Sequence, residues 1–283
     1  MKTTTIHSQP PTAARITTAS KIFSHPSKRI GPAVVAKIKE RDHPNSWLHQ
    51  LLLFALMHRV RVPTMRNAAE RMLAESVRMF FRHLNDLGEL PTPPAGLTFE
   101  YLDETLKISI DPHKSIHAMP HFAEGVNKVF KMVGYKLIEN NTLEAFITSD
   151  NPVIYFDPTI PTELMHPYNI NRQRLDVELM FPITSHLMLW GHSELRPGSL
   201  SFQSITDRKF VKRANVLSTR FANRMVFSNV AHHQPLIEKY CALSPVISVT
   251  HLETRTGRGV IAGFTFGKRE PMPKWRPQVS TIE

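Results

Sequence analysis

The spacing of apolar residues changes character along the chain, and this change constrains the fold more than any other sequence feature. Between Trp47 and Val60, and again between Ala68 and Leu84, apolar residues recur every three or four positions, as on one face of a helix. After Val133 they form short runs separated by Asn, Pro and Gly, a pattern typical of strands. Helices followed by strands favour an α+β fold over a doubly wound parallel sheet.

The predicted elements follow from these patterns. Pro63 ends the first helix, Thr64 is the predicted cap of the second, and Gly88 supplies a stop for it. Further helices are predicted at 122–133 and 207–223, and strands at 144–148, 153–156, 177–183, 186–190, 225–228 and 259–266. The predicted fold is therefore an N-terminal helical pair followed by a mostly antiparallel sheet with one or two further helices.

The chain of 283 residues, 41% of them hydrophobic, is long enough for one large domain or two small ones. We expect a disordered basic arm at residues 1–30, one α+β domain at 31–270 and a flexible basic tail at 271–283. A sub-boundary near residue 95 is the alternative to an undivided domain, because Pro91, Pro93 and Pro94 interrupt regular structure there.

The formal net charge is +11, and the first 39 residues contain seven Lys or Arg and no Asp or Glu. Such a charge favours phosphate-rich partners, so a nucleic acid or a nucleotide is the predicted partner. The alternative is a solvated basic arm on a nearly neutral domain.

The longest apolar run, residues 51–57, is far shorter than the roughly 20 residues of a membrane span, so no membrane partner is expected. The single cysteine, Cys241, excludes an internal disulfide and fits a reducing compartment. The cytoplasm is therefore the expected location, and the sequence predicts no oligomeric state.

Ser149-Asp150-Asn151-Pro152 lies between two predicted strands and has two interpretations. In the first, the segment is simply a tight turn, because Asp and Asn side chains hydrogen-bond to neighbouring backbone and Pro forces the preceding residue into an extended conformation. Alternatively, Asp150 acts as a general base or a metal ligand, with Ser149 and Asn151 as hydrogen-bonding neighbours.

His58, Arg59 and Arg61 lie in the last turn predicted for the first helix, where cations interact favourably with the helix dipole. Arg61 can instead pair with Asp150 or bind a phosphate, because a guanidinium fork suits either anion.

Metal and nucleotide motifs give little further support. His113, His117 and His121 are spaced by four, but Pro120 is expected to break a helix spanning them. The sequence shows no partner at ligand spacing for His232 and His233, and it contains no Walker loop and no Gly-x-Gly-x-x-Gly. No metal ligand is therefore assigned.

Several segments carry a resemblance to one family. Residues 146–153, Phe-Ile-Thr-Ser-Asp-Asn-Pro-Val, resemble the hallmark of the bacterial family called domain of unknown function 4238. Arg61-Val62-Pro63 resembles its helix ending in Arg-Thr-Pro, and residues 181–184 resemble its Phe-Pro-Leu-Ser strand. Asn215, Ala222 and residues 226–228 resemble its later helix-to-strand segment. The resemblance covers residues 47–229 and improves the fold prediction without implying a particular chemistry.

Two departures from that family stand out. Nothing near the N-terminus matches its His-Tyr-Val-Pro-like motif, and His58 stands where the family helix commonly has glutamine. We therefore expect a divergent or N-terminally truncated member.

Taken together, the sequence predicts a phosphate-directed hydrolase, a nuclease or nucleotide hydrolase of a bacterial defence or mobile-element context. The predicted catalytic residues are Asp150, Arg61 and His58. The predicted ligand-binding residues are Ser149, Asn151, Arg59 and Asn215. The cofactor is unknown, and the prediction admits a divalent metal. The alternatives are a non-catalytic basic module that binds nucleic acid or has a structural role, and a degenerate family member without activity.

Overall fold

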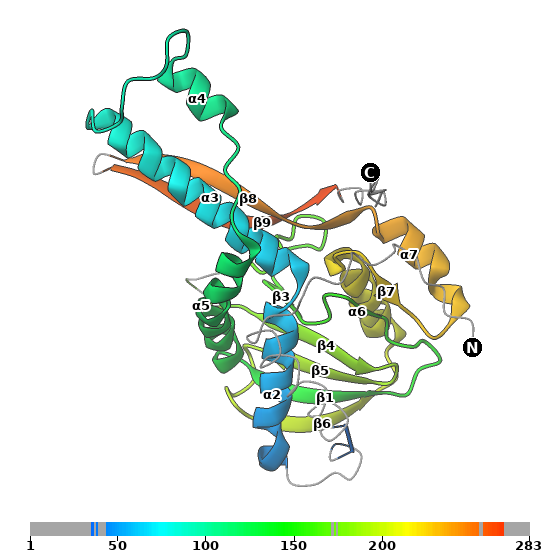
Figure 1. Ribbon diagram of the computed structural model, residues 1–283. Coiled ribbons are helices and arrows are strands. Elements are labelled where there is room, and N and C mark those ends of the chain that lie inside the picture. The colour runs from blue at the N-terminus through cyan, green and yellow to red at the C-terminus, as the bar shows by residue number, and fades with distance from the viewer. Residues whose placement is uncertain are drawn as a thin grey trace, which may run out of the picture.

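The computed structural model describes residues 35–36, 38, 44–170, 173, 175–254 and 257–268 (Figure 1). The predicted basic arm at 1–30 and the predicted tail at 271–283 lie outside the described residues. Among the described residues, no helix is both long enough and apolar enough to cross a membrane.

A five-stranded sheet forms the centre of the molecule, with the strand order β3-β4-β5-β1-β6. Its strands are β1 (Gly134–Asn140), β3 (Ile154–Phe156), β4 (Glu178–Thr184), β5 (Leu187–His192) and β6 (Leu200–Ile205). The β1–β6 pair is parallel and the other pairs are antiparallel, so the α+β prediction with a mostly antiparallel sheet is confirmed.

Helices cover both faces of this sheet (Figure 1). The helices α2 (Pro44–Val60) and α5 (Pro112–Lys131) pack on one face, where Leu137 of β1 is buried. The helix α6 (Arg208–Phe221) packs on the other face, where the next residue of β1, Ile138, is buried. Successive side chains of a strand point to opposite faces, so a central strand between two helical layers buries both sets.

The predicted helical pair is confirmed, with a sharp corner between its members. The second helix, α3 (Pro63–Asp86), has Pro63 in its first turn, where the missing N–H removes no helical hydrogen bond. Its N-cap is Val62 rather than the predicted Thr64, and Val62 offers no side-chain cap. The Thr64 hydroxyl instead donates to Asn223 Oδ1 at 3.4 Å, which links this corner to the loop after α6.

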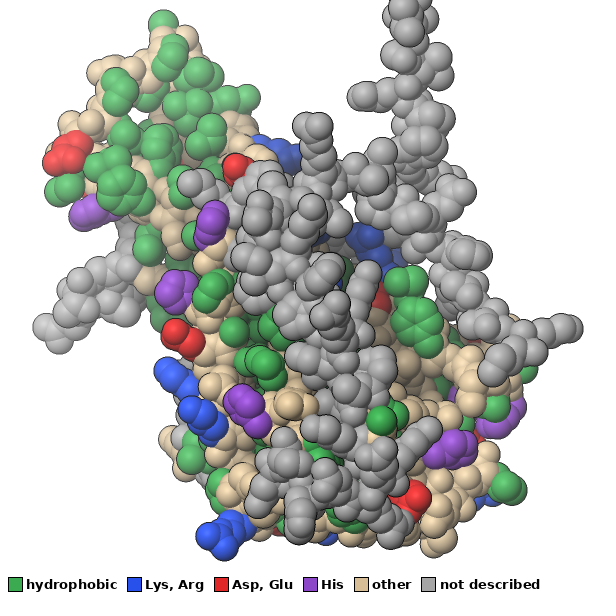
Figure 2. All heavy atoms as spheres, turned by 60° about the horizontal axis from the view of Figure 1, so that its bottom comes forward, with side chains coloured by type: hydrophobic (Ala, Val, Ile, Leu, Met, Phe, Trp, Pro, Cys, Tyr) green, Lys and Arg blue, Asp and Glu red, His purple; other side chains and the backbone are tan. Residues whose placement is uncertain are grey.

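An arm extends from the sheet-containing body. It consists of α3, the short helix α4 (Phe99–Thr105) and a hairpin of β8 (Leu243–Thr254) and β9 (Gly257–Lys268) that packs on α3 (Figure 1). Apolar side chains such as Phe80 are exposed on this arm, and Figure 2 shows them gathered at the upper left.

Two further predictions differ from the structure, and one of them is the expected break of a helix at Pro120, which is wrong. The helix α5 passes through Pro120, although the prediction began it only at residue 122. Proline removes one backbone donor, and packing of α5 against α2 and α3 maintains the helix around that defect. Of the strand predicted at 144–148, only β2 (Thr148–Ser149) forms, paired with β7 (Val226–Phe227).

Candidate functional site

Asp150, the centre of the predicted site, binds the backbone of the loop that follows α6. Its Oδ1 accepts the Asn223 N–H at 2.8 Å, and its Oδ2 accepts the Arg224 N–H at 2.8 Å. The Asp150 N–H donates to the Met225 carbonyl at 3.0 Å. Both carboxylate oxygens therefore hold backbone in place, which is the behaviour expected of an architectural turn.

Asn215 has a comparable structural contact from within α6. This fully buried side chain accepts the Ile147 N–H with Oδ1 at 2.8 Å and donates to the Ala145 carbonyl with Nδ2 at 2.8 Å. It thus satisfies the two backbone groups that a neighbouring strand would otherwise satisfy. This explains why the apolar run before β2 is buried without being a strand.

Asn151 and Ser149 complete this group of contacts. The Asn151 amide donates to the Tyr168 hydroxyl and, at 2.7 Å, to the Phe221 carbonyl at the end of α6. The Ser149 hydroxyl accepts the Asn151 N–H at 3.2 Å. We call the residues Ser149, Asp150, Asn151, Asn215, Asn223 and Arg224 the motif junction.

Arg59 lies next to the motif junction and is fully buried. Its guanidinium lies 3.5 Å from the ring centroid of Tyr168 and 5.8 Å from that of Tyr155. None of its three nitrogens has a hydrogen-bond partner within the described part of the chain. Burial raises the pKa of both tyrosines, and the Arg59 charge opposes that rise. A guanidinium over an aromatic face is stabilised electrostatically, which compensates in part for its burial.

His58 and Arg61 lie elsewhere on the α2–α3 corner. The His58 ring packs edge-on against Phe54, with ring centroids 4.4 Å apart, and Arg61 is exposed. Burial lowers the pKa of His58, and the Arg61 charge lowers it further. The structure thus joins four of the predicted ligand or catalytic residues in the motif junction, links Arg59 to them through Tyr168, and places His58 against an aromatic ring.

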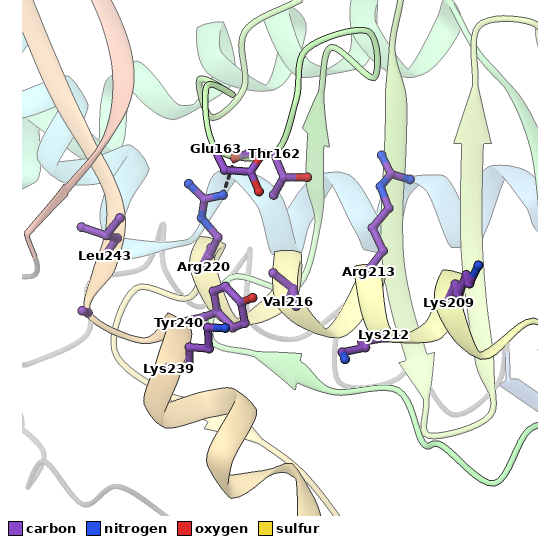
Figure 3. A pocket seen from close by; sticks show the side chains of 11 residues that line it. Thr162, Glu163, Lys209, Lys212, Arg213, Val216, Arg220, Lys239, Tyr240 and Leu243 are labelled. Carbon is purple, nitrogen blue, oxygen red and sulfur yellow. Dashed lines mark hydrogen bonds between the residues drawn. The ribbon is translucent and has the colours of Figure 1, made fainter.

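A basic cleft, which the sequence analysis missed, lies on the outer side of α6. It has a volume of about 660 Å³ and is bounded by α6, by the end of α7 (Gln234–Tyr240) and by the loop at residues 162–163 (Figure 3). Its cationic lining residues are Lys209, Lys212, Arg213, Arg220 and Lys239. Glu163 is the one acidic residue among the lining residues.

Helical periodicity brings four of these cations to one face. From Lys209 onward, each α6 residue that lines the cleft lies three or four positions from another one, so they lie on the same side of the helix. They are Lys209, Lys212, Arg213, Val216 and Arg220. The helix was predicted from its buried side, around Ala214 and Leu217. The spacing of the cations in the same segment already indicated a basic helix face, whereas nothing in the sequence indicated that α7 would form the opposite wall of a cleft.

Two guanidiniums in the cleft have fixed positions. Arg213 makes a bidentate ion pair with the buried Glu178, at 2.7 and 2.6 Å, and Glu178 also accepts Trp190 Nε1 at 2.9 Å. Arg220 donates to the Thr162 carbonyl and lies 4.3 Å from the ring centroid of Phe266. Burial lowers the pKa of Arg220, while the Glu163 carboxylate acts in the opposite direction.

The remaining cations of the cleft are less constrained. Lys209, Lys212 and Lys239 are exposed, and no carboxylate of the described residues lies within ion-pair distance of them. Their charges are therefore available to a negatively charged ligand.

A second group of polar side chains could hold a metal ion. Glu144, His232 and His233 each present a ligand atom, and these atoms lie within 4.8 Å of one another. No third metal ligand lies at ligand spacing from the two histidines in the sequence. The structure supplies Glu144, which is 89 residues from His233 and so is invisible to any local spacing rule.

Comparison with known proteins gives one match. A family model described as "Protein of unknown function (DUF4238)" matches residues 19–232, which is about three quarters of the chain. No curated protein and no solved structure shows a significant match. The segments from which the resemblance was inferred meet in the structure at the motif junction and at the α2–α3 corner beside it. The chain belongs to the family described as Protein of unknown function (DUF4238).

Proposed function

We propose that this protein binds a phosphate-bearing small ligand of nucleotide size in the basic cleft. The observation that carries this proposal is the excess of cations, five against one acid, around one cavity. After Arg213 is paired with Glu178 and one further cation is balanced by Glu163, three positive charges remain. Phosphate oxygens are the ligand groups best suited to such a set of ammonium and guanidinium donors.

The size and the other walls of the cleft favour a nucleotide. Its volume of about 660 Å³ lies within the usual range for small-molecule sites. Figure 3 shows Lys209, Lys212 and Arg213 toward one end and Tyr240 and Leu243 toward the other. The cations suit the phosphates, and the aromatic and aliphatic side chains suit a base.

Nucleic acid is the second candidate, supported by the formal net charge of +11. Hydrolysis of a phosphate ligand, with Asp150, Arg61 and His58 as the acting groups, stays the finer part of the proposal, and it requires a reacting phosphate at the motif junction, because none of these three residues lines the cleft. The backbone contacts of Asp150 support a positioning role at least as well as a catalytic one.

Titration of a fluorescent nucleoside triphosphate into the full chain tests the binding. The variant Lys209→Glu/Lys212→Glu should bind at least about tenfold more weakly, because it loses two charged donors. The control Lys128→Glu/Lys131→Glu changes the net charge equally at exposed positions of α5 and should keep the wild-type affinity. Equal affinities in both variants would refute the cleft as the site.

Short DNA and RNA added as competitors test the second candidate. Phosphate release from the nucleotide, measured with the wild type and with Asp150→Asn, tests the hydrolytic step. Release by the wild type that is abolished in a stable Asp150→Asn variant supports catalysis there, and its absence in the wild type refutes hydrolysis of that nucleotide.

A further inference from the structure

Glu144 and the His232–His233 pair come together from distant parts of the chain. The histidines belong to the 3-10 turn η1 (Ala231–His233) that precedes α7. Glu144 lies between β1 and β2, where its N–H donates to the Thr142 hydroxyl at 3.1 Å and its carbonyl accepts Asn140 Nδ2 at 2.6 Å. The backbone that carries the carboxylate is therefore fixed by short-range hydrogen bonds.

The three side chains converge on one carboxylate oxygen. His233 Nε2 lies 2.9 Å from Glu144 Oε1, and His232 Nε2 lies 3.6 Å from the same oxygen. In a tetrahedral zinc site with bonds of about 2.05 Å, neighbouring ligand atoms lie about 3.3 Å apart. The two observed separations bracket that value, and all three ligand atoms lie within 4.8 Å of one another, so side-chain rotation would bring them onto one ion.

The ring of His233 is oriented so that Nε2 faces Glu144 and Nδ1 faces Ser228. His233 Nδ1 lies 2.7 Å from the Ser228 hydroxyl. That hydroxyl donates its hydrogen to the Val230 carbonyl at 3.0 Å, so it accepts a hydrogen from His233 Nδ1. Metal-bound histidines commonly donate their second ring N–H to such a partner, which fixes the ring and directs the other nitrogen to the metal.

In the tautomer with its hydrogen on Nδ1, His233 brings a second electron-rich atom, Nε2, to 2.9 Å from Glu144 Oε1. With the hydrogen on Nδ1, the Nε2 lone pair faces a carboxylate oxygen, and either a proton or a metal ion can fill the gap. A proton is shared by two atoms, whereas a metal ion can also use His232 Nε2, which lies 3.6 Å from the same oxygen. Arg208 Nη2 lies 4.0 Å from the other carboxylate oxygen, Oε2, which leaves Oε1 for the shared ion.

We propose that Glu144, His232 and His233 bind a divalent transition metal, with Zn²⁺ as the ion best suited to two imidazoles and one carboxylate. Three protein ligands leave the fourth tetrahedral position to water, as in catalytic zinc sites. The proposal does not depend on ligand binding in the basic cleft. The two sites approach each other at the start of α6, where Arg208, beside Glu144, is followed by Lys209, the first cation of the cleft.

Metal binding is measured directly on the full chain, prepared without a histidine tag and without nucleotide. Zn²⁺ is titrated against a chromophoric chelator, and Co²⁺ is titrated with detection of its visible absorption, which is much stronger in four-coordinate than in six-coordinate sites. The first variant is His232→Ala, because this side chain is 55% exposed and its loss should leave the fold intact. The second is Ser228→Ala, which removes the partner of His233.

The matched control is His251→Ala. His251 is an exposed histidine that lies 3.3 Å from Glu75 Oε2, so it has a carboxylate partner, and among the described residues it belongs to no group of three potential metal ligands. Any Zn²⁺ affinity that comes from surface histidines in general is lost equally in this variant and in His232→Ala.

The proposal predicts one equivalent of tightly bound Zn²⁺ in the wild type and in His251→Ala, with a four-coordinate Co²⁺ spectrum. His232→Ala should bind at least about 100-fold more weakly, since even outer partners contribute about 10- to 100-fold, the loss expected for Ser228→Ala. Zn²⁺ affinity in the wild type no higher than in His232→Ala would overturn the proposal and leave His233 and Glu144 as an ordinary ion pair. A six-coordinate Co²⁺ spectrum would overturn the tetrahedral assignment.

Discussion

Replacing Asp150 with asparagine tests whether the carboxylate of the Ser149-Asp150-Asn151-Pro152 segment is mainly structural. The substitution keeps one oxygen and places an amide group against a backbone N–H, so one of the two bonds to Asn223 and Arg224 is lost. A hydrogen bond to a charged group contributes about 1.5–3 kcal/mol. We expect Asp150→Asn to lower the free energy of unfolding by that amount. Asp150→Ala loses both bonds and should lower it by about 3–4 kcal/mol, which is less than twice the largest single loss because water can reach the exposed Arg224 N–H.

Urea denaturation measures this change at equilibrium, and thermal denaturation provides a second readout. At about 2–4 °C per kcal/mol for a chain of this size, the midpoint of Asp150→Asn should fall by about 3–12 °C. The control is Glu104→Gln in α4, an exposed carboxylate whose loss removes the same charge. It should change the free energy of unfolding by no more than about 0.5 kcal/mol.

The stability and the nucleotide affinity of Asp150→Asn answer different questions about this residue. An Asp150→Asn protein as stable as Glu104→Gln would show that the backbone contacts of Asp150 contribute no stability, and the structural argument would fail. A destabilised Asp150→Asn protein that still binds the fluorescent nucleotide with wild-type affinity would place Asp150 in the architecture and outside the ligand site.

Two further predictions concern side chains near the proposed cleft and at the α2–α3 corner. Because burial and Arg61 lower the pKa of His58 below its ordinary 6.5, the unfolded state binds more protons below that pH. Stability should therefore fall as the pH drops from 7 to 5, and His58→Gln should show a smaller fall in urea denaturation; an unchanged pH dependence would contradict the assignment. Arg213→Ala leaves the buried Glu178 without its cation and should cost about 3 kcal/mol, the lower end for such pairs because Arg213 is 37% exposed. Lys212→Ala is its control, and equal stability of these two variants would count against the ion pair.

The elements predicted correctly are those with a regular helical spacing or an unbroken apolar run in the sequence. The helix α6 has one apolar side, and β4 and β5 are joined by the short turn at 184–186. The strand β1 was missed because Lys136, Glu139 and Asn140 interrupt its apolar residues, so it shows neither a regular alternation nor an unbroken apolar run. The edge strand β6 was missed for another reason, since its residues are largely exposed.

The candidate site was visible only where its residues are local. Ser149-Asp150-Asn151 stands out as a motif, but its partners Asn223 and Arg224 lie more than 70 residues away. The cationic side of α6 could have been recognised from spacing alone. The position of α7 against it, like that of Glu144 against His233, depends on the tertiary fold, which no periodicity in one sequence encodes.

The family model matches one wall of the basic cleft and not the other. The wall from α6 lies within residues 19–232, which the family model matches, whereas Lys239, Tyr240 and Leu243 lie after that segment. If the cleft holds the ligand, its phosphate-binding side therefore lies within the part of the chain that defines the family, and the wall next to the rest of the ligand lies outside it.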